Sequence, residues 1–212
     1  MEKLARKLAA DISLSLGYDA EKEAVVAYGL IAMIQITVTT LLVILLGFLA
    51  GAPAEAMIIC FSVSLFRKYS GGAHAKTAEI CTCFSVFYCV VMALVSKRLL
   101  AGILSPIVLG AAVVLVYSCT FLIVYRVAPV DSPNKPIRTE QKKRRMRKGS
   151  FIVLSIYLAI SVVLLIFGSK SDSIRSWEIS LLLGVAWQTL QGSRFIGKMN
   201  GIFISGKEVN QS

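Results

Sequence analysis

Residues 24–50 read AVVAYGLIAMIQITVTTLLVILLGFLA and carry no charged side chain. A transmembrane helix needs about 20 mostly apolar residues to cross a hydrocarbon core about 30 Å thick, so this run is long enough to span a membrane with some tilt. Three more uncharged runs follow, at residues 80–96, 99–125 and 150–168. The sequence therefore predicts helices that are embedded in a membrane.

Two further apolar runs are present. Residues 54–66 would form a helix only about 20 Å long, which favours a short or partly re-entrant segment. A last apolar run extends from Trp177 to about Phe195. Together the runs predict an all-α, polytopic transmembrane helix bundle with about six membrane segments, four full and two short. The bundle is expected to form a single domain over residues 1–212.

The composition agrees with this class of protein. Hydrophobic residues make up 56% of the chain and the mean hydropathy is +0.73, whereas globular domains are roughly 45–50% apolar. The five cysteines lie in or at the edge of apolar runs, so no disulfide framework of a secreted domain is visible. The first 23 residues are charged and lack the apolar core of a cleavable signal peptide. We expect no cofactor and no metal site.

The segment 1–23 is expected to form an amphipathic helix that ends near Gly17. Its apolar residues recur every four positions and its basic residues lie opposite them. The apolar residues are Leu4, Leu8, Ile12 and Leu16, and the basic residues are Lys3, Arg6 and Lys7. Such a helix can lie at the membrane surface or pack on the rest of the protein, and the pattern fits both arrangements.

The distribution of lysine and arginine predicts the orientation in the membrane. With a cytoplasmic N-terminus, 19 of the 23 basic residues fall in inside segments and four fall outside. The inside segments are 1–23, 66–79, 126–149 and 192–212. Lys97 and Arg98 would then mark an exit on the outer side, and Pro106 is expected to kink the next helix near one end.

The segment 66–79 and the residues directly after it carry the candidate chemistry. The stretch 67–81 reads RKYSGGAHAKTAEIC, and it contains His74, the only histidine of the chain, seven positions before Cys81. A thiol becomes a good nucleophile as the thiolate, and an imidazole is the usual side chain that takes its proton near neutral pH. The pair is therefore a candidate nucleophile and base.

The spacing of the pair sets a condition on its shape. In one straight helix His74 and Cys81 would lie about 10 Å apart along the axis, which is too far for proton transfer. The histidine must therefore fold back over the start of the helix, and Gly71 and Gly72 give the backbone that freedom. The alternative is that His74 is an ordinary interfacial residue and Cys81 an inert packing residue.

Cys81 is the best nucleophile among the five cysteines. It is expected in the first turn of a helix next to a cationic loop, and both surroundings favour the thiolate. Cys83 would point to another face of the helix, and Cys89 and Cys119 are interpreted as packing residues. Three features are unranked candidates to orient the imidazole: Glu79, Ser70 and the loop around Asp131.

A basic segment, 126–149, is the second polar feature. Its run 142–148 reads KKRRMRK, which fits attraction to anionic membrane lipid, worth about 1 kcal/mol per basic residue at the surface. The alternative role for this run is to bind an acidic partner. Nucleic acid is not expected, because the run is short, lacks aromatic residues and lies at a membrane. The prolines of 129–136 limit the backbone and could brace Lys135 against the site.

Two stretches, RKYSGGAHAKTAEIC and the loop APVDSPNKPI at 128–137, resemble the motifs of the accessory gene regulator B (AgrB) family of bacterial membrane cysteine endopeptidases. The resemblance implies that His74 and Cys81 are the catalytic pair. It implies removal of the C-terminal tail of an AgrD-like precursor of a quorum-sensing autoinducing peptide, through an acyl-thioester that closes a thiolactone or lactone ring. The expected peptide-binding residues are Arg67, Lys68, Gly71, Gly72, Lys135, Arg144, Arg145 and Arg147. The expected location is the bacterial cell membrane, with the N-terminus and the catalytic loop in the cytoplasm.

Other functions compete with this interpretation. A non-enzymatic transporter or channel that exports a small peptide would use the loop as a gate and the histidine as a proton relay. The spans argue against it, because they contain almost no buried charge and no sign of a broken helix apart from the polar Gln35 and Pro106. A disulfide exchanger is disfavoured because Cys81 and Cys83 form a C-x-C pair without the usual C-x-x-C spacing. The sequence leaves the oligomeric state open, and a homodimer that joins two sites is compatible with a protein of this size.

Overall fold

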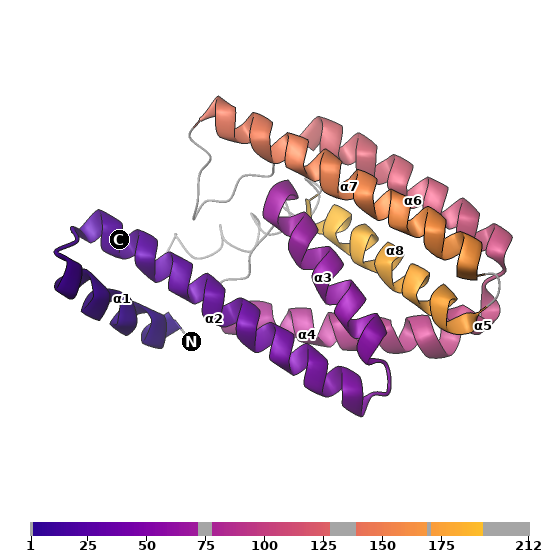
Figure 1. Cartoon of the computed structure of the whole chain (residues 1–212), viewed down its shortest axis with the longest axis horizontal. Coiled ribbons are helices and arrows are strands. Elements are labelled where there is room, and N and C mark those ends of the chain that lie inside the picture. The colour runs from indigo at the N-terminus through magenta and orange to yellow at the C-terminus, as the bar shows by residue number, and fades with distance from the viewer. Residues whose placement is uncertain (1, 72–77, 128–138, 169–170, 193–212) are drawn as a thin grey trace, which may run out of the picture.

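The structure is a computed structural model that describes residues 2–71, 78–127, 139–168 and 171–192. Its elements in these ranges are helices that lie side by side in a bundle (Figure 1). Four helical segments are long and apolar enough to cross a membrane. They are α2 (Ala20–Leu49), the continuous segment Ala78–Ile103 that begins with α4 (Ala78–Leu94), α6 (Pro106–Val127) and α7 (Glu140–Gly168). The prediction of an all-α transmembrane bundle is confirmed.

Two shorter helices, α3 (Pro53–Ser70) and α8 (Asp172–Gly192), complete the predicted set of four full and two short segments. They pack more extensively on each other than any other two helices do in the described part of the chain. Figure 1 shows α8 enclosed by α3, α6 and α7. The contact is tight, because a Cβ atom added at Gly184 would overlap the Oγ atom of Ser62. The centre of the bundle is therefore the α3–α8 pair.

The N-terminal helix α1 (Glu2–Leu16) ends at Gly17, which has a φ of 63°, and the stop expected there is confirmed. The helix packs along α2 (Figure 1) through its small residues Ala5, Ala9 and Ser13, which are buried. The predicted apolar row stays exposed, from 37% at Ile12 to 58% at Leu16. Helix α1 therefore packs on the protein with one face and leaves its apolar row exposed.

The break between the second and third long helices differs from the prediction. Lys97 and Arg98 lie inside a π-helical turn (Val95–Leu100) that continues α4 into the short α5 (Ala101–Ile103), so the break between two helices expected at these residues is wrong, whereas the membrane exit expected there stays a prediction. Both side chains instead reach another helix end: Lys97 Nζ donates to Gly51 O (2.8 Å), and the Arg98 guanidinium donates to Ala50 O (3.3 Å).

The kink expected at Pro106 is also wrong, because Pro106 is the first residue of α6. Its fixed φ and missing N–H suit the first position of a helix. Leu104 is extended (ψ 121°), and the Ser105 hydroxyl accepts a hydrogen bond from Val108 N (3.3 Å), which caps the new helix. The chain therefore reverses at residues 104 and 105.

A buried polar network joins the helix ends on that side of the bundle. Glu55, in the first turn of α3, is 1% exposed. One carboxylate oxygen accepts a hydrogen bond from Ser176 Oγ of α8 (2.8 Å), and the other lies 3.7 Å from Lys97 Nζ. Ser96 Oγ donates to Ser176 O (2.6 Å). These contacts tie α3, α8 and the π-helical turn together.

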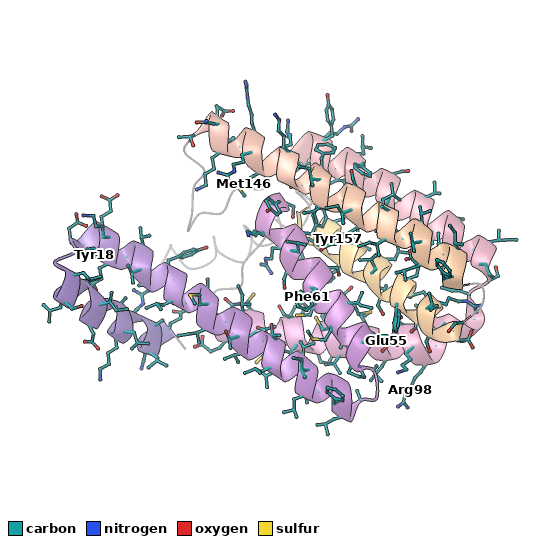
Figure 2. All side chains as sticks on the ribbon, in the orientation of Figure 1. Tyr18, Glu55, Phe61, Arg98, Met146 and Tyr157 are labelled. Carbon is teal, nitrogen blue, oxygen red and sulfur yellow. The ribbon has the colours of Figure 1, made fainter. Side chains whose placement is uncertain are left out.

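The opposite end of the bundle is basic. It holds the end of α3 with Arg67 and Lys68 and the start of α7 with the run 142–148, and we call it the basic end. Figure 2 shows Met146, from this run, at the other end of the bundle from Glu55 and Arg98. The basic run is therefore the first part of the long helix α7, where the sequence analysis expected only a polar loop segment.

Candidate active site

Cys81 lies near the start of α4 with its side chain in the bundle, 9% exposed, whereas Cys83 is exposed. This confirms that the two thiols occupy different faces of the helix. Phe84 and Tyr88 follow Cys81 at three and seven positions and so share its face. Both rings stack on Trp187 of α8, with centroids 5.7 and 4.3 Å apart. The face of α4 that carries Cys81 therefore turns toward α8.

The end of α3 is held by the same helix. Gly71 has a φ of 73°, in the left-handed region where glycine is favoured, so the predicted need for glycine is confirmed at this position. The Nε2 atom of Gln188 donates to Gly71 O (2.7 Å) and to Ser70 Oγ (3.1 Å). Gln188 is 1% exposed. Helix α8 therefore fixes the point where the chain leaves α3.

Three predicted site residues, Gly72, His74 and Lys135, lie outside the described residues. The contact between the His74 imidazole and the Cys81 thiol therefore stays a prediction. The structure does place the two flanks of the segment 72–77, Gly71 and Ala78, on helices that both contact α8.

The predicted peptide-binding residues of the basic end lie on two helix ends that touch. Arg67 is half-buried and Lys68 exposed at the end of α3, while Arg144, Arg145 and Arg147 are exposed at the start of α7. Their backbones are brought together by the adjoining residues, because a Cβ atom at Gly149 would overlap the ring of Tyr69. The positive charges of both helices thus lie at one end of the bundle.

Glu2 adds a contact that the sequence analysis missed. One of its carboxylate oxygens accepts a hydrogen bond from Ala78 N (3.1 Å), the first residue of α4. Carboxylates are favourable at helix N-termini because they satisfy free N–H groups and the helix dipole. The start of α1 therefore docks on the start of the helix that carries Cys81.

Buried charge in the bundle is a further correction. The spans were expected to hold almost no charge, yet Glu55 and Glu178 are 1% and 0% exposed. Glu55 has the partners described above. Glu178 lies beside Ser161 of α7, but neither of its carboxyl oxygens forms a hydrogen bond of ordinary geometry within the described residues. Glu178 lies between Trp177 and Ile179 in the last apolar run, and no role was expected for it from the sequence.

These features define a class: an all-helical integral membrane protein with a buried thiol at the start of a transmembrane helix, beside a basic, glycine-containing segment. Residues 1–191 match the model of the Accessory gene regulator B family. The chain belongs to this family. Membership assigns it a role in the accessory gene regulator system, which implies association with an AgrD-like precursor.

Relatives of the chain support the same assignment. The chain is 35% identical over 193 residues to AgrB-like protein 2 of Clostridium perfringens strain 13. It is 33% identical over 192 residues to an AgrB-like protein of Clostridium perfringens strain SM101. Each alignment covers 90% of this chain and 90% of the relative. An AgrB-like protein of Halalkalibacterium halodurans is 23% identical over 211 residues, which is 100% of this chain and 98% of the relative. No solved structure matches the chain.

Proposed function

We propose that this chain is a membrane cysteine endopeptidase that removes the C-terminal tail of an AgrD-like precursor and promotes closure of its thiolactone or lactone ring. The observation that carries the proposal is the position of Cys81. Its thiol lies near the start of α4, inside the bundle, and α4 packs against α3, whose C-terminal end carries Arg67 and Lys68. A precursor with an acidic tail would be attracted to that end.

The chemistry follows from a thiol and an imidazole. His74 takes the proton of the Cys81 thiol, and the thiolate attacks the carbonyl carbon of the scissile peptide bond. The C–N bond breaks, the leaving amine takes the proton from His74, and an acyl-thioester remains on Cys81. A cysteine or serine side chain of the precursor then attacks the thioester, gives its proton back through His74, and releases Cys81 with the ring closed.

The structure offers two features that suit this reaction. Cys81 lies near the start of α4 on its buried face, a few positions after the segment that contains His74. The segment that contains His74 is only six residues long between the described flanks Gly71 and Ala78. A short segment with a fixed start reduces the conformational entropy that must be lost to bring the two groups together.

The nucleophile is tested with a synthetic precursor in detergent or liposomes. Cys81→Ala and His74→Ala should each abolish the acyl-enzyme adduct, detected by mass spectrometry of the intact chain. Cys83→Ala is the matched control, because it removes an exposed thiol two residues away on another face. An adduct that survives in Cys81→Ala, or that is lost in Cys83→Ala alone, would contradict the assignment.

We further propose that the N-terminus and the basic end face the cytoplasm, as the excess of basic residues there favours. The test uses single cysteines in a cysteine-free chain in intact cells. A membrane-impermeant thiol reagent added outside should label Arg98→Cys, at the Glu55 end, and spare Lys68→Cys, at the basic end. Both side chains are exposed, so the reverse pattern would overturn the orientation.

Peptide export without chemistry is the competing function, and the buried Glu178 is the observation that favours it, because ionisable residues inside membranes often mark transport pathways. The two functions separate in proteoliposomes. An endopeptidase cleaves the precursor in detergent without any membrane gradient, whereas a transporter moves the uncleaved peptide into the vesicles and loses this movement in Glu178→Gln.

A further inference from the structure

We propose that Gln188 of α8 is a positioning residue of the active site: it holds the backbone at Ser70 and Gly71 and thereby sets where the segment that contains His74 begins. The inference rests on the proposed function and deepens it. It starts from the two hydrogen bonds that Gln188 Nε2 donates, to Gly71 O at 2.7 Å and to Ser70 Oγ at 3.1 Å.

The orientation of the Gln188 amide is fixed by its partners. Gly71 O can only accept a hydrogen bond, so the group that faces it must be the NH2 of the side chain. The Ser70 hydroxyl donates to Phe66 O (3.0 Å), which leaves its oxygen free to accept from Gln188. Both N–H groups of the amide are therefore used at the end of α3.

A packing role alone does not explain this residue. Gln188 is 1% exposed, and its Oε1 atom has no hydrogen-bond partner within the described part of the chain. Burying an amide with an unpaired carbonyl is costly, and a leucine or methionine would fill the same space without that cost. The hydrogen bonds that the NH2 group of Gln188 donates to Gly71 O and Ser70 Oγ account for a buried amide at this position.

The helix that carries Gln188 is a rigid support. One turn earlier, Gly184 lies against Ser62 of α3 without room for a methyl group. The neighbouring Trp187 stacks on Tyr88 of α4, and Tyr88 donates a hydrogen bond to Leu183 O (3.1 Å). Helix α8 therefore contacts α3 at the start of the His74 segment and α4 on the face of Cys81. A positioning residue is effective when its own backbone is held in this way.

Gln188→Met tests the inference, because methionine has a similar length and no group that donates a hydrogen bond. The matched control is Thr189→Val, which also removes a buried hydrogen bond from α8, the one between the Thr189 and Thr120 hydroxyls (2.9 Å). This control changes the contact with α6 and leaves Gly71 untouched. Precursor acylation is measured in detergent for both variants, together with the thermal midpoint.

We expect Gln188→Met to lower kcat for acylation about tenfold or more with KM changed less than about threefold, because misplacement of a reacting group by about 1 Å can cost that much. Thr189→Val should stay within about twofold of the wild type in kcat. Equal losses of kcat in the two variants, in proportion to their losses of thermal stability, would overturn the inference.

Hydrogen exchange separates failure of the inference from failure of the proposed function. If the wild-type chain forms no adduct with the precursor, the proposed function fails. Hydrogen exchange then decides by itself whether Gln188 holds the backbone at Gly71. The Gly71 amide donates to Arg67 O (3.0 Å) in the last turn of α3. Faster exchange at residues 67–71 in Gln188→Met than in Thr189→Val supports the positioning contact, and equal exchange overturns it.

Discussion

Replacing Gly184 by alanine tests the packing that holds the candidate site. The added Cβ would overlap Ser62 Oγ and lie 3.2 Å from Ser62 Cβ and 3.5 Å from Ile59 O. Bringing Cβ and Oγ to van der Waals distance requires a separation of about 1 Å or more between α3 and α8. The alternative is rotation of the serine, which breaks its hydrogen bond to Ile59 O (2.9 Å).

The expected cost of Gly184→Ala is about 1–3 kcal/mol, the usual range for overpacking a close-packed interior. For a chain of this size about 1 kcal/mol corresponds to roughly 2–4 °C in the unfolding midpoint, so the midpoint in detergent should fall by several degrees. Gly110→Ala is the matched control, because nothing lies within 4 Å of its added Cβ. It should be neutral or slightly stabilising, since alanine is the better helix former.

The pairing of the two residues is tested by a double substitution. Ser62→Ala removes the overlapping Oγ and leaves a tight but tolerable Cβ contact, so the double variant should regain at least half of the loss. The same separation would carry Gln188 away from Gly71 O, and precursor acylation should fall with the midpoint. An unchanged midpoint in Gly184→Ala, or a double variant less stable than Gly184→Ala, would refute the described α3–α8 contact.

Three further predictions concern the two ends of the bundle. Gly149→Ala should push the Tyr69 ring away from α7, because the added Cβ has no space there. The expected loss is about 1–3 kcal/mol in the free energy of unfolding, seen as a lower thermal midpoint in detergent. Glu55→Gln should cost about 1 kcal/mol by weakening the bond to Ser176 and the attraction to Lys97, whereas Glu140→Gln, at an exposed pair with Lys143, should cost less than about 0.5 kcal/mol. Neutralising Arg144, Arg145 and Arg147 together should weaken precursor binding more at low than at high salt, since exposed charges are screened; a loss independent of salt would indicate misfolding instead.

The long spans could be predicted because a membrane imposes a simple rule on the sequence. An uncharged run such as 24–50 can only be solvated by lipid or protein, and its backbone must be satisfied within a helix. The turns at Gly17 and Gly71 were also predictable, because only glycine readily adopts a positive φ. Both residues do have a positive φ in the structure. These features depend on residues that are near in sequence.

The boundaries that were wrong depend on distant contacts. A break between two helices was expected at Lys97 and Arg98 because charges are costly in lipid. In the structure the helix continues through both residues, and their side chains donate hydrogen bonds to the carbonyls of Gly51 and Ala50, which lie 46 and 48 positions away. Periodicity and hydropathy describe one helix at a time and carry no information about such a partner.

The polar residues of α8 were missed for the same reason. The last apolar run was interpreted only as one more membrane segment, and its polar residues Gln188 and Glu178 were given no role. A glutamine in such a run needs hydrogen-bond partners inside the protein, and this need was the signal available in the sequence. Its partner Gly71 is 117 positions away, so the identity of the partner could not be inferred from the pattern.

The position of α8 also bears on the proposed catalytic segment 72–77, which is only six residues long. Trp187 and Gln188 are adjacent, and through them one helix contacts the Cys81 face of α4 and the end of α3. A shift of α8 would therefore disturb both contacts together. A segment of six residues between two fixed ends has far fewer conformations than one with free ends. Under the proposed function, the bundle core would thus act on the His74 segment through the ends that flank it.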